Sequence, residues 1–257
     1  MKVDILGCSG GMGQQQQTTC FRINDSLLID AGSGLGELDQ GALKQIRHIC
    51  LTHAHLDHIC FLPLLIDNLF ESLTQPIQVY ALPEVIENLR KHLFNWQIWP
   101  DFTRLPTPEK PVMTLHEIGY QQTLELGDLS LTPFRVFHTV PTCGYHLRSK
   151  KHGTSFAITS DTTFDASLLD SLNQLGPLDV LLTECAFPDR MLELARLSRH
   201  LTPQLLQALL NQLTHAPKAV WISHLKPSQH LEIANELAQA NLNCELRVLR
   251  SGEQWQI

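Results

Sequence analysis

Short apolar segments, each bounded by turn-forming or polar residues, recur along the whole chain. Val, Ile, Leu and Phe dominate these segments, and this length and composition predict strands that are buried on at least one face. The expected strands are Val3–Leu6, Cys20–Ile23, Leu27–Ile29, Ile46–Leu51, Ile77–Leu82, Leu129–Phe137, Ser155–Thr159, Val180–Leu182, Ala219–Ile222 and Leu246–Leu249.

Amphipathic segments of helical length lie between many of these strands. Thr202 followed by Pro203 predicts an N-cap with proline at the first helical position, and Ser228 is expected to cap the last helix. Strands concentrate in the first third of the chain and alternate with helices afterwards, which predicts an α/β fold with packed sheets. No linker divides the chain, so one domain spanning 1–257 is expected. The expected helices are Ile59–Ser72, Pro83–Asn95, Asp165–Leu175, Pro203–Thr214 and Ser228–Ala240.

Two segments are expected to lie on the surface. Gln14–Gln17 follows three nearby glycines and is interpreted as a solvent-exposed loop. Trp96–Pro111 is rich in proline and contains two tryptophans, and loops of this length often act as lids.

Composition narrows the class of protein. The 257 residues are 43% hydrophobic and 18% charged, as in ordinary globular proteins, and the net charge of −7 argues against a broad nucleic-acid surface. No two of the seven cysteines have CxxC spacing, which predicts buried free thiols in a reducing compartment. No apolar stretch is long enough to span a membrane, so a cytoplasmic location is expected.

Five of the expected strands are followed, immediately or within a few residues, by a side chain that can bind metal or transfer protons. Ligand sites in α/β proteins gather at strand ends, where loops converge on a rigid sheet. A shared site is therefore expected from these residues: His53, His138, Asp161, Glu184 and His224.

The densest group is His53-Ala-His55-Leu-Asp57-His58. Residues i and i+2 of an extended chain point the same way, so His53 and His55 can share one ion, while Asp57 and His58 can reach a second. Two divalent ions about 3.5–4 Å apart form the usual clamp for phosphate-ester displacement. Imidazole and carboxylate ligands suit zinc, manganese or iron. The other histidines are interpreted as surface or core residues: His48, His92, His116, His146, His152, His215 and His230.

HAHLDH after an apolar strand resembles the signature of the metallo-β-lactamase superfamily, and the later motifs follow in order over nearly the whole chain. The resemblance implies a four-layered αβ/βα sandwich (the metallo-β-lactamase fold). It also implies two metal ions, most typically Zn²⁺, with Mn²⁺ or Fe²⁺ as alternatives. By that likeness the first ion is held by His53, His55 and His138, the second by Asp57, His58 and His224, and Asp161 bridges both.

Two further motifs resemble the phosphodiesterase branch of that superfamily: Thr183-Glu-Cys-Ala-Phe187 and Ser198-Arg-His-Leu-Thr-Pro203. The block THAHLDHICFLPLLIDN is most similar to class II 3′,5′-cyclic nucleotide phosphodiesterases. This resemblance implies hydrolysis of cAMP or cGMP to the 5′-monophosphate. Asp57 would orient the attacking water, and His200, held by Glu184, would assist the departing oxygen. Gly10, Gly11, Ser33 and Gly34 are candidates for bringing backbone close to the phosphate.

Several alternatives stay open. A tRNA 3′-processing endonuclease shares the motifs, but it would need a basic surface and usually an extended arm. A non-catalytic metal-binding sandwich acting as a scaffold is a different class, which the complete ligand set disfavours. A redox di-iron enzyme would replace one histidine by a carboxylate, and a thioesterase would not explain Glu184 with His200. Dimers are common in the branch, which leaves a homodimer open.

Overall fold

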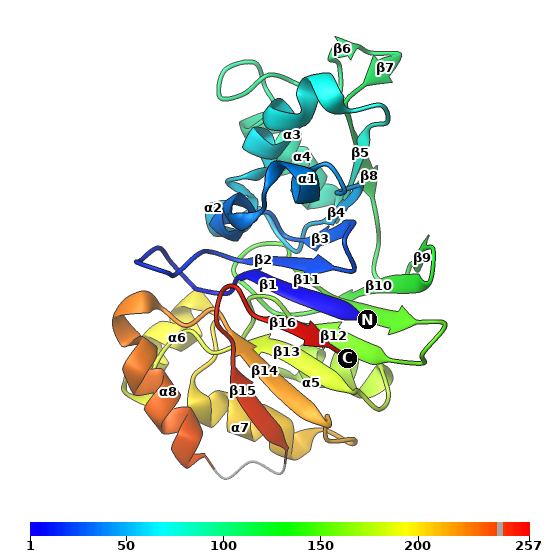
Figure 1. Ribbon diagram of the computed structural model, residues 1–257. Coiled ribbons are helices and arrows are strands. Elements are labelled where there is room, and N and C mark those ends of the chain that lie inside the picture. The colour runs from blue at the N-terminus through cyan, green and yellow to red at the C-terminus, as the bar shows by residue number, and fades with distance from the viewer. Residues whose placement is uncertain (241–243) are drawn as a thin grey trace.

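Two seven-stranded sheets form the centre of the structure. The computed structural model describes residues 1–240 and 244–257 (Figure 1). In hydrogen-bonded order the first sheet contains β16 (Gln254–Gln256), β1 (Lys2–Gly7), β2 (Cys20–Ile23), β3 (Leu27–Ile29), β4 (His48–Cys50), β5 (Ile77–Ala81) and β8 (Met113–Glu117). The second contains β15 (Glu245–Val248), β14 (Ala219–Ser223), β13 (Val180–Glu184), β12 (Ser155–Ile158), β11 (Cys143–Ser149), β10 (Leu129–Arg135) and β9 (Leu124–Leu126).

Helices cover the outer face of each sheet, so the molecule has four layers (Figure 1). The helices near the first sheet are α1 (Gln40–Leu43), α2 (Leu56–Ile59), α3 (Leu62–Leu69) and α4 (Pro83–His92). Those near the second sheet are α5 (Ala166–Gln174), α6 (Leu192–Ser198), α7 (Pro203–Gln212) and α8 (His230–Gln239). The four-layered αβ/βα sandwich predicted above is confirmed. Short 3₁₀ turns span Ser33–Glu37, Phe70–Ser72, Asp189–Met191 and Pro227–Gln229, and β6 (Pro106–Thr107) pairs with β7 (Lys110–Pro111) in the exposed segment.

Alternating side chains divide the apolar residues between the inner and outer faces of the second sheet. In β14, Trp221 packs into the core between the sheets, whereas Val220 and Ile222 belong to the core beneath the outer helices. Successive strand residues point to opposite faces, so a continuous apolar strand can fill two cores. This explains why the later strands read as unbroken apolar runs.

Most expected elements are present, with shifted ends. The expected helix Ile59–Ser72 is divided into α2, α3 and a 3₁₀ turn, because Pro63 has no N–H to donate to the carbonyl of Ile59. Thr202 caps α7 as predicted, since its side chain accepts from the backbone N–H of Leu205. The prediction for Ser228 is wrong: this residue lies within a 3₁₀ turn, and α8 begins at His230.

Some elements were not expected from the sequence. In β11 the apolar residues alternate with Gly144, His146 and Arg148, so the segment has no continuous apolar run. β8 and β9 are short and partly exposed, and α6 is a helix of seven residues in which only Ala195 is buried. Within residues 1–240 and 244–257, no helix has the length and apolar character that crossing a bilayer requires. All seven cysteines are free.

Tyr145 joins the two sheets immediately behind the strand end that leads to His53. Its fully buried hydroxyl donates to the backbone carbonyl of Leu51 over 2.8 Å. We expect Tyr145→Phe to lower the free energy of unfolding by about 1–3 kcal/mol, because it leaves that buried carbonyl without a donor. Urea denaturation measures the change.

The matched control is Tyr80→Phe, since the half-buried Tyr80 hydroxyl has no hydrogen-bond partner among the described residues. This variant should change the free energy of unfolding by less than about 0.5 kcal/mol. Equal losses in the two variants would contradict a specific role for the Tyr145 hydroxyl.

Candidate metal centre and active site

Residues that follow strands of both sheets meet in one cluster. His53 follows β4 of the first sheet, whereas Asp161 follows β12 and His224 follows β14 of the second. Three sets of ligand-type side chains each have donor atoms within 4.8 Å of one another: His53, His55, His138 and Asp161; Asp57, His58 and His224; and Asp161, His200 and His224. All seven residues predicted as metal ligands are therefore brought together.

The first group centres on His55 Nδ1. This atom lies 3.1 Å from His53 Nε2 and 3.4 Å from His138 Nε2. Oδ2 of Asp161 lies 3.8 Å from His53 Nε2 and 4.0 Å from His138 Nε2. Three imidazole nitrogens and one carboxylate oxygen thus surround one small volume, an arrangement that suits a divalent cation.

The second group lies beside the first and faces the other oxygen of Asp161. Oδ1 of Asp161 is 3.4 Å from His58 Nε2 and 3.2 Å from His224 Nδ1. Oδ2 of Asp57 is 3.9 Å from both His58 Nε2 and His224 Nε2. Because the two oxygens of Asp161 face different groups, this carboxylate is positioned to contact two ions at once.

Three of the histidines have their second ring nitrogen held by the protein. Asp30 Oδ2 lies 2.7 Å from His58 Nδ1. His53 Nδ1 lies 3.0 Å from the hydroxyl of Thr52. His138 Nδ1 donates a hydrogen bond to the carbonyl oxygen of Arg199 over 3.1 Å. In all three rings the held atom is therefore Nδ1. Such contacts fix the tautomer and direct Nε2 of each ring into the cluster.

The buried cluster contains polar atoms that the protein itself leaves unpaired. His58 Nε2 and both ring nitrogens of His224 are buried and have no hydrogen-bond partner among the described residues. An unpaired buried polar atom costs about 1–3 kcal/mol, so several of them in one place indicate a binding partner such as a metal ion. The donor set fits the divalent metal ions that the fold implies.

A hydrogen-bonded glutamate–histidine pair lies at the edge of the cluster. His200 Nδ1 is 2.6 Å from Glu184 Oε1, and both residues are buried. Glu184 also accepts from the backbone N–H groups of Thr162, Ala186 and Leu201. The carboxylate is thereby held rigidly, and His200 Nε2 is the ring nitrogen left to act on a bound molecule.

Burial and neighbouring charges oppose each other throughout the site. Burial disfavours charge on Asp161, but the imidazoles of His224 and His58 hold its pKa well below its usual range. Burial lowers the pKa of His53 and His224 well below the ordinary value, because it disfavours the charged imidazolium. Burial opposes protonation of His200, but Glu184 overcomes this effect and raises its pKa.

Backbone strain is concentrated around the same residues. Asp30, Ser160, Arg199 and His224 have φ values of 60°, 58°, 54° and 61°. Non-glycine residues in this region cost of order 1–3 kcal/mol and persist where surrounding contacts hold them. The backbone of Gly10 packs closely against His224: a Cβ at this position would lie 2.5 Å from the His224 carbonyl oxygen, so only glycine fits.

Sequence reasoning missed several residues that support the cluster. Asp30 directly follows β3, so the strand-end pattern that found His53 could have found it. Arg199 gave no such signal: its guanidinium donates to the carbonyl of His138 over 2.5 Å and lies 4.2 Å from the centre of the Phe137 ring. Lys226 donates to the carbonyl of Gly10, which holds its positive charge near His200.

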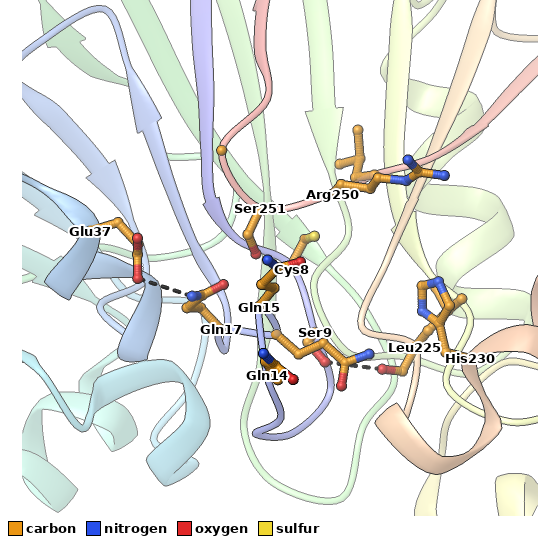
Figure 2. A pocket seen from close by; sticks show the side chains of 13 residues that line it. Cys8, Ser9, Gln14, Gln15, Gln17, Glu37, Leu225, His230, Arg250 and Ser251 are labelled. Atoms are coloured by element: carbon orange, nitrogen blue, oxygen red, sulfur yellow. Dashed lines mark hydrogen bonds between the residues drawn. The ribbon is translucent and has the colours of Figure 1, made fainter.

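A hollow of about 420 Å³ lies next to the cluster (Figure 2). The Gln14–Gln17 loop forms one wall and Leu225, one residue beyond His224, lies on the other side. The prediction of an exposed loop is confirmed for Gln14 and Gln15, whereas Gln16 and Gln17 are half-buried. The side-chain amide of Gln17 donates to Glu37. None of the predicted metal ligands lines this hollow.

Comparison with known families agrees with the fold and the cluster. The sequence profile of the family described as Beta-lactamase superfamily domain matches residues 26–242. A probable 3′,5′-cyclic-nucleotide phosphodiesterase of Yersinia pestis is 26% identical over 314 aligned positions, which cover 98% of this chain and 88% of that protein. Ribonuclease Z of Pyrococcus abyssi is 30% identical over 135 residues, which cover 51% of this chain. That match spans 41% of the Pyrococcus protein, so the chain corresponds to less than half of its length.

Two solved structures have the same fold. Unliganded yeast PDE1 superposes with a TM-score of 0.83 at 20% identity, covering 100% of this chain and 99% of that one. The short form of human tRNase Z superposes with a TM-score of 0.74 at 19% identity, with the same coverage. At these identities the similarity establishes the architecture, and the chemistry has to be argued from the site.

Asp30 tests whether the contacts behind the cluster control metal binding. It accepts from the backbone N–H and hydroxyl of Thr52 as well as contacting His58. Asparagine tolerates the positive φ at this position but has one acceptor oxygen fewer. We expect Asp30→Asn to weaken binding of a divalent ion by about 10–100-fold, measured by competition with a chromophoric chelator.

The control is Asp25→Asn, the same substitution at an exposed position whose carboxylate contacts Lys2. This variant should bind metal as tightly as the unaltered protein. Unchanged affinity in a folded Asp30→Asn protein would show that Asp30 does not support the cluster.

Proposed function

This chain belongs to the beta-lactamase superfamily, and we propose that it is a two-metal phosphodiester hydrolase whose substrate is a 3′,5′-cyclic nucleotide. The observation that carries the proposal is the buried Glu184–His200 pair, 2.6 Å apart, beside a cluster able to hold two cations. A cluster alone fits many hydrolases of this fold. A rigidly held imidazole at its edge adds a proton donor for an alkoxide leaving group.

We assign the ligands in two sets that share Asp161. His53, His55 and His138 form one set, and Asp57, His58 and His224 form the other. Two imidazole nitrogens around a tetrahedral zinc ion lie roughly 3.4 Å apart, since each zinc–nitrogen bond is about 2.0–2.1 Å. The spacings of 3.1 and 3.4 Å about His55 Nδ1 fit imidazoles that share one divalent ion, for which we propose Zn²⁺; Mn²⁺ and Fe²⁺ accept the same donors.

The bound cations would supply a nucleophilic water at neutral pH and neutralise charge on the phosphate. Asp57, whose side chain is 30% exposed, would orient that water and accept its proton. Attack at phosphorus breaks the bond to the 3′ oxygen, and His200 Nε2 gives a proton to the departing oxygen. Glu184 keeps that proton available by raising the pKa of His200. The product is the 5′-monophosphate.

Two observations favour a small substrate over tRNA. The similarity to the Yersinia phosphodiesterase extends over 98% of this chain, whereas the similarity to the ribonuclease Z of Pyrococcus abyssi, that of Lachnoclostridium phytofermentans and the chloroplastic tRNase Z of Arabidopsis thaliana covers 51%, 60% and 83% of it. The net charge of −7 disfavours an RNA surface. The ribonuclease Z relatives keep tRNA 3′-processing as the alternative, and a non-catalytic scaffold would leave Glu184 and His200 without a role. The free thiols support a cytoplasmic location.

The proposal is tested by assaying metal-replete protein with cAMP, cGMP and precursor tRNA in parallel. Hydrolysis of a cyclic nucleotide to its 5′-monophosphate is the expected result. Cleavage of precursor tRNA alone would establish the alternative, and no cleavage of any of the three would leave a metal-binding scaffold.

His200 provides the sharpest single substitution. We expect His200→Ala to lower kcat by about 10²–10⁴-fold while metal content stays the same, because the proton donor is lost and the ligand sets remain. The measurement combines steady-state kinetics with metal analysis of the same preparation.

His215→Ala is the control, since His215 is exposed and lies in the segment between α7 and the start of β14, whereas His224 follows the other end of β14. It should leave kcat unchanged. Loss of metal together with activity in His200→Ala would instead make His200 a ligand, as its proximity to Asp161 and His224 allows.

A further inference from the structure

A small apolar cavity of about 200 Å³ opens directly beside the metal cluster. We propose that it binds the nucleobase of the substrate, with the amide of Asn88 hydrogen-bonding the polar edge of the base; this inference rests on the function proposed above. The residues that line the cavity come from α2, α4 and the loops that follow β4 and β10: Ala54, His55, Leu56, Ile59, Asn88, His92, Leu93, Val140 and Pro141.

His55 connects this cavity, here called the Asn88 cavity, to the reaction centre. Its Nδ1 faces His53 and His138, while the residue also forms part of the cavity wall. The loop that carries His138 supplies Val140 and Pro141 on another side. A molecule whose phosphate lies on the cluster can therefore place an adjoining group in the cavity without leaving the site.

The size and walls of the cavity suit a small, largely apolar group such as the ring of a nucleobase. Pockets that enclose an entire drug-sized ligand measure about 300–1,000 Å³, so this one fits a single part of a nucleotide. Leu56 is 71% exposed although it lies between two residues of the cluster, which leaves its apolar side chain available to a bound molecule. Base-recognition pockets combine apolar walls with hydrogen bonds to the edge of the base.

Asn88 supplies the polar part. It is half-buried on α4, one turn before His92 on the same face, and its amide has no hydrogen-bond partner within the described parts of the chain. A primary amide offers a donor beside an acceptor, the pattern that pairs with the edge of a nucleobase. His92, which was interpreted above as a surface or core residue, borders this cavity as well.

The test compares substrates with and without a base. For cAMP, cGMP and an abasic 1′-O-methylribose 3′,5′-cyclic phosphate, kcat/KM is measured in the metal-replete protein and in Asn88→Ala. The ratio of kcat/KM with base to that without base should fall by about tenfold in Asn88→Ala. Val140→Trp, which fills the cavity, should lower the same ratio further.

Asn235→Ala is the matched control, because Asn235 is exposed on α8 away from both cavities. Its ratio should equal that of the unaltered protein. Ratios within twofold of that value in both Asn88→Ala and Val140→Trp, with cAMP still hydrolysed, would overturn the cavity assignment and leave the proposed function intact.

A binding measurement separates the two proposals when no cyclic nucleotide is hydrolysed. Calorimetry of the metal-replete protein should show tighter binding of 5′-AMP than of ribose 5-phosphate, and Asn88→Ala should remove the difference. Equal binding of the two compounds would overturn the cavity assignment whatever the reaction. A parallel assay with precursor tRNA distinguishes the source of the base. If the base belongs to tRNA, Asn88→Ala should slow tRNA cleavage and not the hydrolysis of a cyclic nucleotide.

Discussion

Three buried carboxylates at one edge of the sandwich impose the constraint on which the site depends. A buried charge is costly unless it is paired. Asp30 is balanced by His58 and Glu184 by His200, each at hydrogen-bond distance. Asp161 has several imidazoles around it at 3.2–4.0 Å, and most of their second nitrogens are already held. A divalent cation would pair with Asp161 and with the buried nitrogens of His58 and His224 that have no hydrogen-bond partner among the described residues, so this edge fits a cation.

Both sheets contribute to that edge, so the site depends on how they are joined. Thr52 forms the junction: it donates to Asp30, accepts from the hydroxyl of Ser160 and contacts His53. The Thr52 carbonyl also accepts from the backbone N–H of Cys143. Strain at Asp30 and Ser160 is maintained by this network. The first sheet thus supplies the dense histidine block, and the second supplies the residues that complete it.

The strand-end pattern predicted the site better than it predicted the fold. His138, Asp161 and His224 could be predicted because each follows an apolar strand within a few residues, and that pattern is visible in the local sequence. Asp30 follows the same pattern and was overlooked. The contacts of Arg199 with His138 join residues 61 positions apart, and no local pattern carries that pairing. β11 was missed for a related reason, since its neighbours, rather than a continuous apolar run, make it a strand.

Placing ligands on both sheets couples metal binding to the stability of the sandwich edge. His53 and His55 follow β4 of the first sheet and His138 follows β10 of the second, so an ion held by all three would link the two halves. Binding to the folded state alone stabilises it, and an ion in the second set would pair the buried nitrogens of His58 and His224. Of the residues that line the Asn88 cavity, His55 alone belongs to a ligand set, so most of the proposed base contacts could change without altering the ligands. A change of base preference would then leave the residues that hold the ions intact.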